Sequence, residues 1–225
     1  MLENYLFLLK DYPFFSGMTE AEMLSVLRCT DAQILSKAKG TYLLRAGDCT
    51  TSMGLVLEGA VIVEQVDLWG HRNIMNKIEA GGFFGESFAA TPGAVLNINV
   101  VAAESCEVLM LSISRLLQVC SNACEHHNKL IRNLVSVLAE KVLLFNAKIT
   151  HISKRSTREK LLSYLSSEAL RQGKRSFSIP FDRQQLADYL CVDRAAMSSE
   201  LSKLQQEGIL KTNRKHFELL TAVEL

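Results

Sequence analysis

The chain has 225 residues, 48% of them hydrophobic, and a net charge of +1, which allows one large or two modest buried cores and argues against disorder. Lys and Arg number 12 against 15 Asp and Glu over residues 1–150 but 13 against 9 over residues 151–225, which favours an anionic partner at the C-terminal end. The start lacks the basic segment of a signal peptide and no apolar run could span a bilayer, so we expect a cytoplasmic protein whose six cysteines are thiols.

The first thirty residues predict short helices around a break. The turn Pro13–Gly17 separates a first short helix from a second. Thr19 and Glu22 have the spacing of a capping box, in which each side chain satisfies a free backbone donor of the other residue. Leu24 and Leu27 follow on one face of the second helix.

From about Ala32 to Ser112 the apolar residues alternate with a period of two. Glycines separate short β-prone runs, and no helical run of ten residues interrupts them. The runs are Tyr42–Leu44, Leu55–Leu57, Val61–Val66, Ile74–Ile78, Leu96–Val101 and Val108–Leu111. This pattern predicts an antiparallel sandwich or barrel, and it argues against a parallel sheet with crossover helices.

A long helix is predicted from about His126 to Ile152, after a short one at Ser114–Cys120. Its apolar residues recur at alternating steps of four and three, the spacing of a coiled-coil seam. The seam is Ile131, Val135, Leu138, Val142, Phe145, Ile149 and Ile152. A second apolar row on a neighbouring face is Leu130, Leu134, Val137 and Leu144. Two apolar faces favour a helix that packs on its own domain and also pairs with a second copy of the chain. A core helix of one globular domain is the alternative.

A second capping box, Ser156 with Glu159, starts a further helix that is predicted to end near Arg171. The cap implies a joint between two helices rather than one rod, so we place a domain boundary at 153–156.

Two short helices joined by a tight turn are predicted next. Asp182 can cap a helix through Leu190, and Asp193 can cap a second one that ends at Gly208. Leu186, Ala187, Leu190, Met197, Leu201 and Leu204 form the inner faces. The small Ala187, placed where the helices would cross, completes a helix-turn-helix pattern. A β-hairpin, Ile209–Leu210 and Phe217–Leu220 around the turn 213–215, then predicts the wing of a winged helix.

In the order of these segments the chain resembles regulators of the CRP/FNR superfamily. The likeness covers nearly the whole length. It is carried by Pro13–Met18, Leu57-Glu58-Gly59-x-Val61, Gly82–Ser87, the long helix and the helix-turn-helix. The resemblance implies an α+β fold in which an N-terminal antiparallel β-roll of the cupin-like jelly-roll type (1–125) is followed by a dimerisation helix (126–152) and a winged helix-turn-helix (153–225).

One departure from the family pattern bears on the effector. Cyclic-nucleotide binders carry Arg and then Ser or Thr at the places where this chain has Leu96 and Asn97, and no Arg lies between Gly85 and Arg115. A buried phosphate without a cation or donor is costly, so cyclic AMP is not the expected ligand. The residues expected to bind an apolar or aromatic effector are Gly85, Glu86, Ser87, Leu96, Asn97, Ile98, Val142, Phe145 and Asn146. The alternative is that these side chains fill the pocket.

A metal or redox cofactor is not expected. The iron–sulfur branch of the family has closely spaced N-terminal cysteines, whereas the first cysteine here is Cys29. Cys120 and Cys124 precede His126 and His127 at helical spacing, but solvated or buried thiols are the commoner explanation of such cysteines. Haem has no better support. His71 is predicted to lie at the tip of a hairpin, where a histidine is more often simply exposed than a haem ligand. Redox sensing by cysteine stays open.

The resemblance also implies the residues that meet DNA. If Asp193 starts the recognition helix, the first exposed turns present Arg194, Ala195, Ser198, Ser199 and Ser202. Arg194 can fork onto guanine O6 and N7. Arg183, Gln184, Lys211, Arg214 and Lys215 are expected to contact phosphates. Where the family often has Glu and a second Arg, this chain has Ala195 and Ser199, so its half-site should differ. Solvated surface charge is the alternative explanation for each cation.

The expected function is that of a homodimeric transcription regulator that binds double-stranded DNA and responds to a small-molecule or redox signal. RNA polymerase is an expected partner. The alternative is a ligand-binding module whose winged helix contacts protein. An enzyme is disfavoured, because the sequence has no nucleophile elbow or phosphate loop.

Overall fold

The computed structural model describes residues 2–117 and 125–221. The chain divides into two compact units, residues 1–140 and 141–225. The boundary lies within helix α5 (Glu125–Ile152), so each part of this helix is described with its own unit. None of the described helices is long and apolar enough to cross a membrane.

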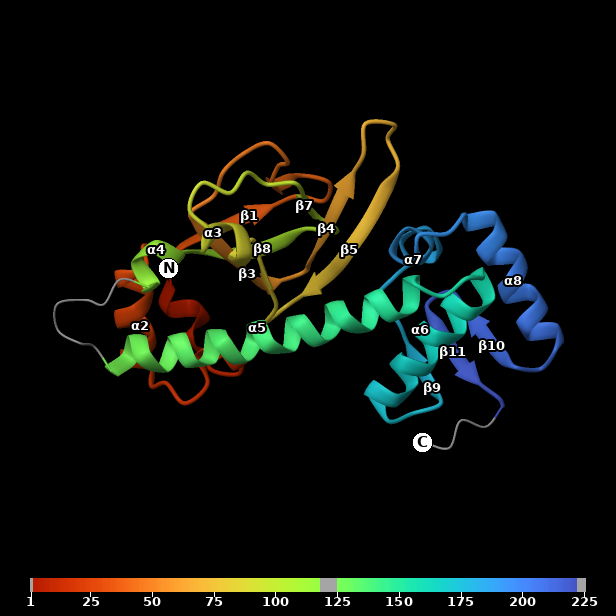
Figure 1. Ribbon diagram of the computed structural model, residues 1–225. Helices are drawn as coiled ribbons and strands as arrows, with labels where there is room; N and C mark the ends of the chain where they lie inside the picture. The colour runs from red at the N-terminus through yellow and green to blue at the C-terminus, as the bar shows by residue number, and fades with distance from the viewer. Residues whose placement is uncertain (1, 118–124, 222–225) are drawn as a thin grey trace. The chain divides into compact units, whose positions relative to one another are not determined.

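In the described part of the first unit, eight strands form two four-stranded antiparallel sheets (Figure 1). One sheet has the order β1-β8-β3-β6 and the other β2-β7-β4-β5. The strands are β1 (Gln33–Lys37), β2 (Tyr42–Leu44), β3 (Ser52–Glu58), β4 (Ala60–Val66), β5 (Arg72–Glu79), β6 (Phe83–Phe84), β7 (Asn99–Ala102) and β8 (Cys106–Ser112). The predicted antiparallel β-roll is therefore confirmed.

The central strands of the first sheet separate two apolar cores. Phe84 points into the roll, where it packs with Val56 and Val108, while its neighbour Phe83 points to the opposite face. A Cβ on Gly54 would lie 2.0 Å from the tip of the Phe84 ring, so only glycine lets this ring lie flat against β3. Side chains of both sheets thus fill the interior of the roll.

Short helices cover the other face of this sheet. They are η1 (Leu2–Tyr5), α1 (Leu6–Leu9), η2 (Pro13–Phe15), α2 (Glu20–Cys29), α3 (Glu86–Ala89) and α4 (Ile113–Leu117). Phe14 packs edge-on against Phe83 at 4.7 Å between ring centroids. Leu130 and Leu134 of α5 join the same core, and Asn133 donates to the backbone oxygens of Phe14 (2.9 Å) and Ser16 (3.0 Å). The first part of α5 is therefore fixed to the helical layer.

In the described part of the second unit, three helices and a small sheet follow the end of α5. Its elements are α6 (Thr157–Gln172), β9 (Ser176–Ser178), α7 (Arg183–Leu190), α8 (Arg194–Gln206), β10 (Leu210–Asn213) and β11 (His216–Leu219). The strands form an antiparallel sheet in the order β10-β11-β9. Capping boxes start α6 at Ser156 and α7 at Asp182, and Gly173 with φ +62° ends α6. This arrangement is a winged helix-turn-helix, as predicted.

The structure differs from the sequence predictions in several places. Strands β1 and β6 and helix α3 were not predicted. Leu144, which was placed on the face of α5 that packs on its own domain, is 51% exposed, so that face ends before it. The predicted short helix at 114–120 is present as α4, and its last three residues lie outside the described part of the chain. The division at 125 and 152 stays a prediction.

Candidate DNA-binding surface and effector site

Helix α8 begins after a turn of three residues and exposes one polar face. Cys191 has a left-handed backbone (φ +53°) that ends α7, and the carboxylate of Asp193 accepts a hydrogen bond of 2.8 Å from the amide of Ala196. Met197, Leu201 and Leu204 are buried. The exposed face therefore carries the predicted base-reading residues Arg194, Ala195, Ser198, Ser199 and Ser202, all of which are exposed.

Cations of the wing lie beside this face in the same unit. Lys211 on β10 and the turn residues Arg214 and Lys215 are exposed, and Arg214 adopts φ +54° at the tip of the hairpin. The amide of Ile179 donates to the oxygen of Lys215 (2.9 Å), which ties the turn to the segment before α7. Exposed cations of this kind can contact phosphates.

The two predicted phosphate contacts at the start of α7 differ in their surroundings. Gln184 is exposed, and its amide donates to Asp188 Oδ1 at 2.7 Å. Arg183 is only partly exposed, and burial lowers the pKa of its guanidinium. Its Nη2 donates to Thr212 Oγ1 at 2.6 Å, so this side chain points toward the wing.

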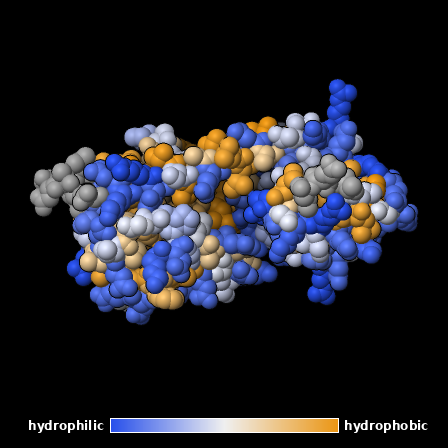
Figure 2. Space-filling view, turned by 90° about the horizontal axis from the view of Figure 1, so that it is seen from below, coloured by the Kyte–Doolittle hydropathy of each residue, from blue (hydrophilic) through white to orange (hydrophobic). Residues whose placement is uncertain are grey.

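The predicted dimer seam on α5 is largely uncovered. Val135, Val142, Phe145 and Ile149 are 42–60% exposed, and Ile131, Leu138 and Ile152 are half-buried. Exposed apolar side chains are orange in Figure 2. Large apolar residues at this spacing on one helix face form the kind of surface that a partner helix covers.

The predicted effector residues fall into two groups. In the first unit, Gly85 has φ +77° and a Cβ there would lie 2.8 Å from Leu44, Glu86 and Leu96 are buried, and Ile98 is half-buried. Ser87 and Asn97 are exposed. Val142, Phe145 and Asn146 are exposed and belong to the second unit. A single pocket formed by both groups stays a prediction.

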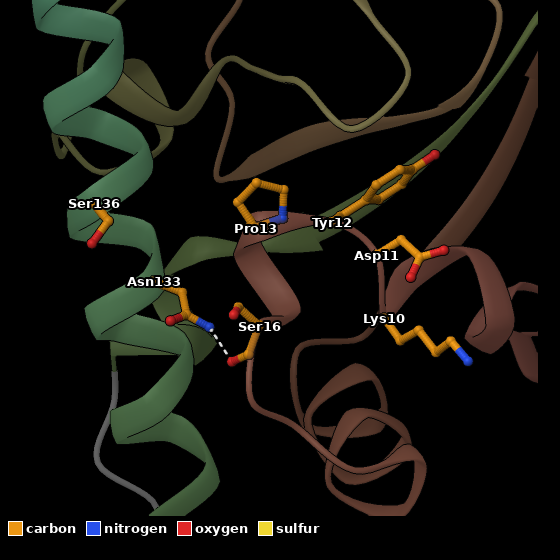
Figure 3. A pocket seen from close by; sticks show the side chains of 7 residues that line it. All are labelled: Lys10, Asp11, Tyr12, Pro13, Ser16, Asn133 and Ser136. Carbon is orange, nitrogen blue, oxygen red and sulfur yellow. Dashed lines mark hydrogen bonds between the residues drawn. The ribbon is translucent and has the colours of Figure 1, made fainter.

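A pocket that the sequence did not reveal lies in the first unit between the N-terminal segment and α5 (Figure 3). Its volume is about 440 Å³. The lining residues are Lys10, Asp11, Tyr12, Pro13, Ser16, Asn133 and Ser136. Tyr12 donates to the oxygen of Leu57 (3.0 Å), and Asn133 is engaged with the N-terminal segment. Since the two lining segments are more than 100 residues apart, no local motif could have predicted it.

A polar cluster at the end of α5 was also missed. Lys148 is 4% exposed, its Nζ lies 4.7 Å from the centroid of the Tyr189 ring on α7, and burial lowers its pKa to about 8. His151 Nδ1 and Ser163 Oγ are 2.8 Å apart, and burial lowers the pKa of this histidine. These contacts join α5 to α6 and to the first helix of the helix-turn-helix.

The cysteines and histidines show no metal site within the described residues. Cys29 and Cys49 are exposed, while burial raises the pKa of Cys106. His126 lies 2.9 Å from Glu22, and His71 lies at a hairpin end 2.8 Å from Asp67. The pair Cys120 and Cys124 lies outside the described residues.

Two family models match the chain. The cyclic nucleotide-binding domain matches residues 34–123, and the Crp-like helix-turn-helix domain matches residues 159–225. Together they cover more than half of the sequence. Among curated proteins, no sequence matches this chain.

Several solved structures have the same fold. The c-di-GMP responsive global regulator CLP of Xanthomonas campestris has a TM-score of 0.71 at 17% identity, over 90% of this chain and 98% of that one. FixK2 from Bradyrhizobium japonicum has 0.65 at 19%, over 86% and 99%. CprK in complex with OCPA has 0.71 at 18%, over 89% and 91%. The paired domain matches and this shared fold confirm the resemblance. The chain is therefore a regulator and not an enzyme, and it belongs to the CRP/FNR superfamily.

Proposed function

We propose that the protein is a homodimeric transcription regulator that binds an operator through α8 and the wing, under the control of a signal received by the β-roll. The observation that carries this proposal is the exposed polar face of α8. A helix that buries three apolar residues and turns an arginine and three serines outward has the form of a recognition helix.

Direct base contacts come from Arg194 together with the small residues of the same face. Arg194 donates two hydrogen bonds to one guanine, the serines donate to base edges or phosphates, and Ala195 contacts a thymine methyl group. Gln184, Lys211, Arg214 and Lys215 contact phosphates, which fixes the position of the helix without reading sequence.

Dimerisation through α5 places two such helices on one duplex. The uncovered row formed by Val135, Val142, Phe145 and Ile149 supports this proposal, because a monomer would leave these side chains in water. A symmetric dimer binds two half-sites about one helical turn of DNA apart.

The effector is a small molecule other than cyclic AMP, or a redox signal. Leu96 is buried where the family resemblance would place a phosphate-binding arginine, and an apolar cluster lies between the sheets, so a buried ring phosphate would meet an apolar side chain at this position. The solved relatives include one described as c-di-GMP responsive and one bound to OCPA, which supports varied effectors on this fold. A roll that is simply filled and has no ligand is the alternative. Thermal unfolding with and without millimolar cyclic AMP tests whether cyclic AMP binds. A ligand present at 100 times its Kd would stabilise the folded protein by about 2.7 kcal/mol.

The second candidate is a ligand-binding module whose winged helix contacts protein. Both candidate functions assign the same role to the first unit. The second candidate differs because it predicts no affinity for duplex DNA. RNA polymerase as a partner and a cytoplasmic location stay predictions of the sequence.

The experiment that separates the candidates is selection of duplexes from a random pool by the full chain, followed by titration of Arg194→Ala. We expect this variant to lose about 1–3 kcal/mol of affinity and to relax one base position. Lys174→Ala, an exposed cation outside the predicted set, is the matched control. Equal affinity and footprint for parent and Arg194→Ala would refute the assignment of α8.

A further inference from the structure

The side chain of Arg183 contacts the wing, formed by β10, β11 and the turn between them. Its Nη2 donates to Thr212 Oγ1 at 2.6 Å, and its Cζ lies 5.0 Å from the centroid of the Phe217 ring. Its Nη1 is buried and has no hydrogen-bond acceptor among the residues that the structure describes. The guanidinium thus contacts the wing through Nη2 and lies over the ring of Phe217.

The two residues that Arg183 contacts form one cross-strand pair. Thr212 on β10 lies opposite Phe217 on β11, just before the hairpin turn. Phe217 is fully buried and lies opposite Phe177 of β9, whose ring stacks on it at 6.4 Å. Arg183 therefore joins the first residue of α7 to the base of the wing turn.

The contact depends on the shape of the guanidinium as well as on its charge. A planar guanidinium can lie over an aromatic ring and donate in its own plane at the same time, whereas an ammonium cannot do both. Because Nη1 is buried, it does not reach a phosphate in this conformation. This burial distinguishes Arg183 from the exposed Lys211, Arg214 and Lys215.

We propose that Arg183 is a positioning residue, which clamps the wing to α7 and so holds Arg214 and Lys215 where both can reach phosphates while α8 lies in the groove. This inference rests on the proposed DNA-binding function. The amide of Thr212 also donates to Gln205 Oε1 on α8 at 3.1 Å, so the clamp acts with a second link between wing and helix.

A double-mutant cycle on the full chain separates a clamp from a direct phosphate contact. The variants are Arg183→Lys, the wing double variant Arg214→Ala with Lys215→Ala, and their combination, each titrated on a duplex selected by the wild-type protein. We expect Arg183→Lys to weaken binding roughly tenfold and to reduce the salt slope by about 1 for each chain of the dimer in the wild-type background, with little further loss once the wing cations are absent. The same fold-loss in both backgrounds would overturn the clamp.

Hydrogen exchange of the wing amides at residues 210–219, measured without DNA, gives an independent readout. Arg183→Lys and Thr212→Val are expected to speed this exchange, whereas the control Arg194→Ala leaves it unchanged. Unchanged exchange in both clamp variants would overturn the inference while leaving the proposed function intact. A wild-type protein that binds no duplex would instead refute the proposed function, and the DNA role of the clamp with it.

Discussion

Replacing Phe145 by alanine tests the proposed dimer surface on α5. The side chain is 42% exposed in the single chain. If complete burial of a phenylalanine removes 150–250 Å² from water, pairing hides a further ~60–100 Å² per chain. At about 25 cal/mol per Å², this contributes about 1.5–2.5 kcal/mol per chain, and twice that for two chains.

Allowing for the area that alanine still buries, Phe145→Ala should weaken the dimer by about 2–4 kcal/mol, or roughly 30- to 700-fold in the dimer Kd. Sedimentation equilibrium of the full chain over a concentration series, without DNA, measures this constant. Leu143→Ala is the matched control, because Leu143 is 68% exposed on the same helix but lies outside the seam. Equal dissociation constants for the two variants would refute the assignment of the seam.

Three further predictions concern stability. Leu201→Ala should cost about 2–5 kcal/mol of unfolding free energy because Leu201 is buried in the recognition helix, whereas the exposed neighbour Ser202→Ala should change it by less than about 0.5 kcal/mol in chemical denaturation. Lys148→Met should raise the free energy of unfolding by at most about 3 kcal/mol below pH 8, because burial lowers the pKa of the lysine from 10.5 to about 8. The folded wild type binds fewer protons than the unfolded chain, so the difference in stability between the two proteins should shrink as the pH rises toward 10.5. A difference that does not change with pH would contradict the reasoning. Glu22→Gln should destabilise the chain at neutral pH, because hydrogen bonds from Lys129 and Thr19 lower the pKa of the carboxyl group from 4.5 to about 2. The melting curves of the two proteins should converge as the pH falls from 4.5 to 2. An undiminished difference at about pH 2 would show that the ionised carboxylate is not the source of the stability.

The sequence predicts most of the second unit because its signals are local. The capping residues Asp182 and Asp193 start their helices where predicted, and the buried faces follow from the spacing of Leu186, Leu190 and Met197. A capping side chain acts within three residues, so its effect can be read along the chain.

The sequence is less informative where packing comes from distant segments. Strand β3 is buried on both faces, because the helical layer covers one and the roll the other, so it lacks the alternation of a half-exposed strand. The edge strand β1 mixes polar and apolar residues, and only its pairing with β8 makes it a strand. The contact between Arg183 and the wing involves Phe217, which lies 34 positions later, so no motif near Arg183 could have predicted it.

The most direct test of the central claim is the salt dependence of binding between the full chain and duplex DNA. With three wing cations per chain, Lys211, Arg214 and Lys215, a dimer neutralises six phosphates, so the logarithm of the association constant should fall against the logarithm of the salt concentration with a slope of about −5. Fluorescence anisotropy on a selected duplex measures this slope. A slope near zero, or no binding at low salt by a dimeric protein, would contradict the account and leave the winged helix as a protein-binding module.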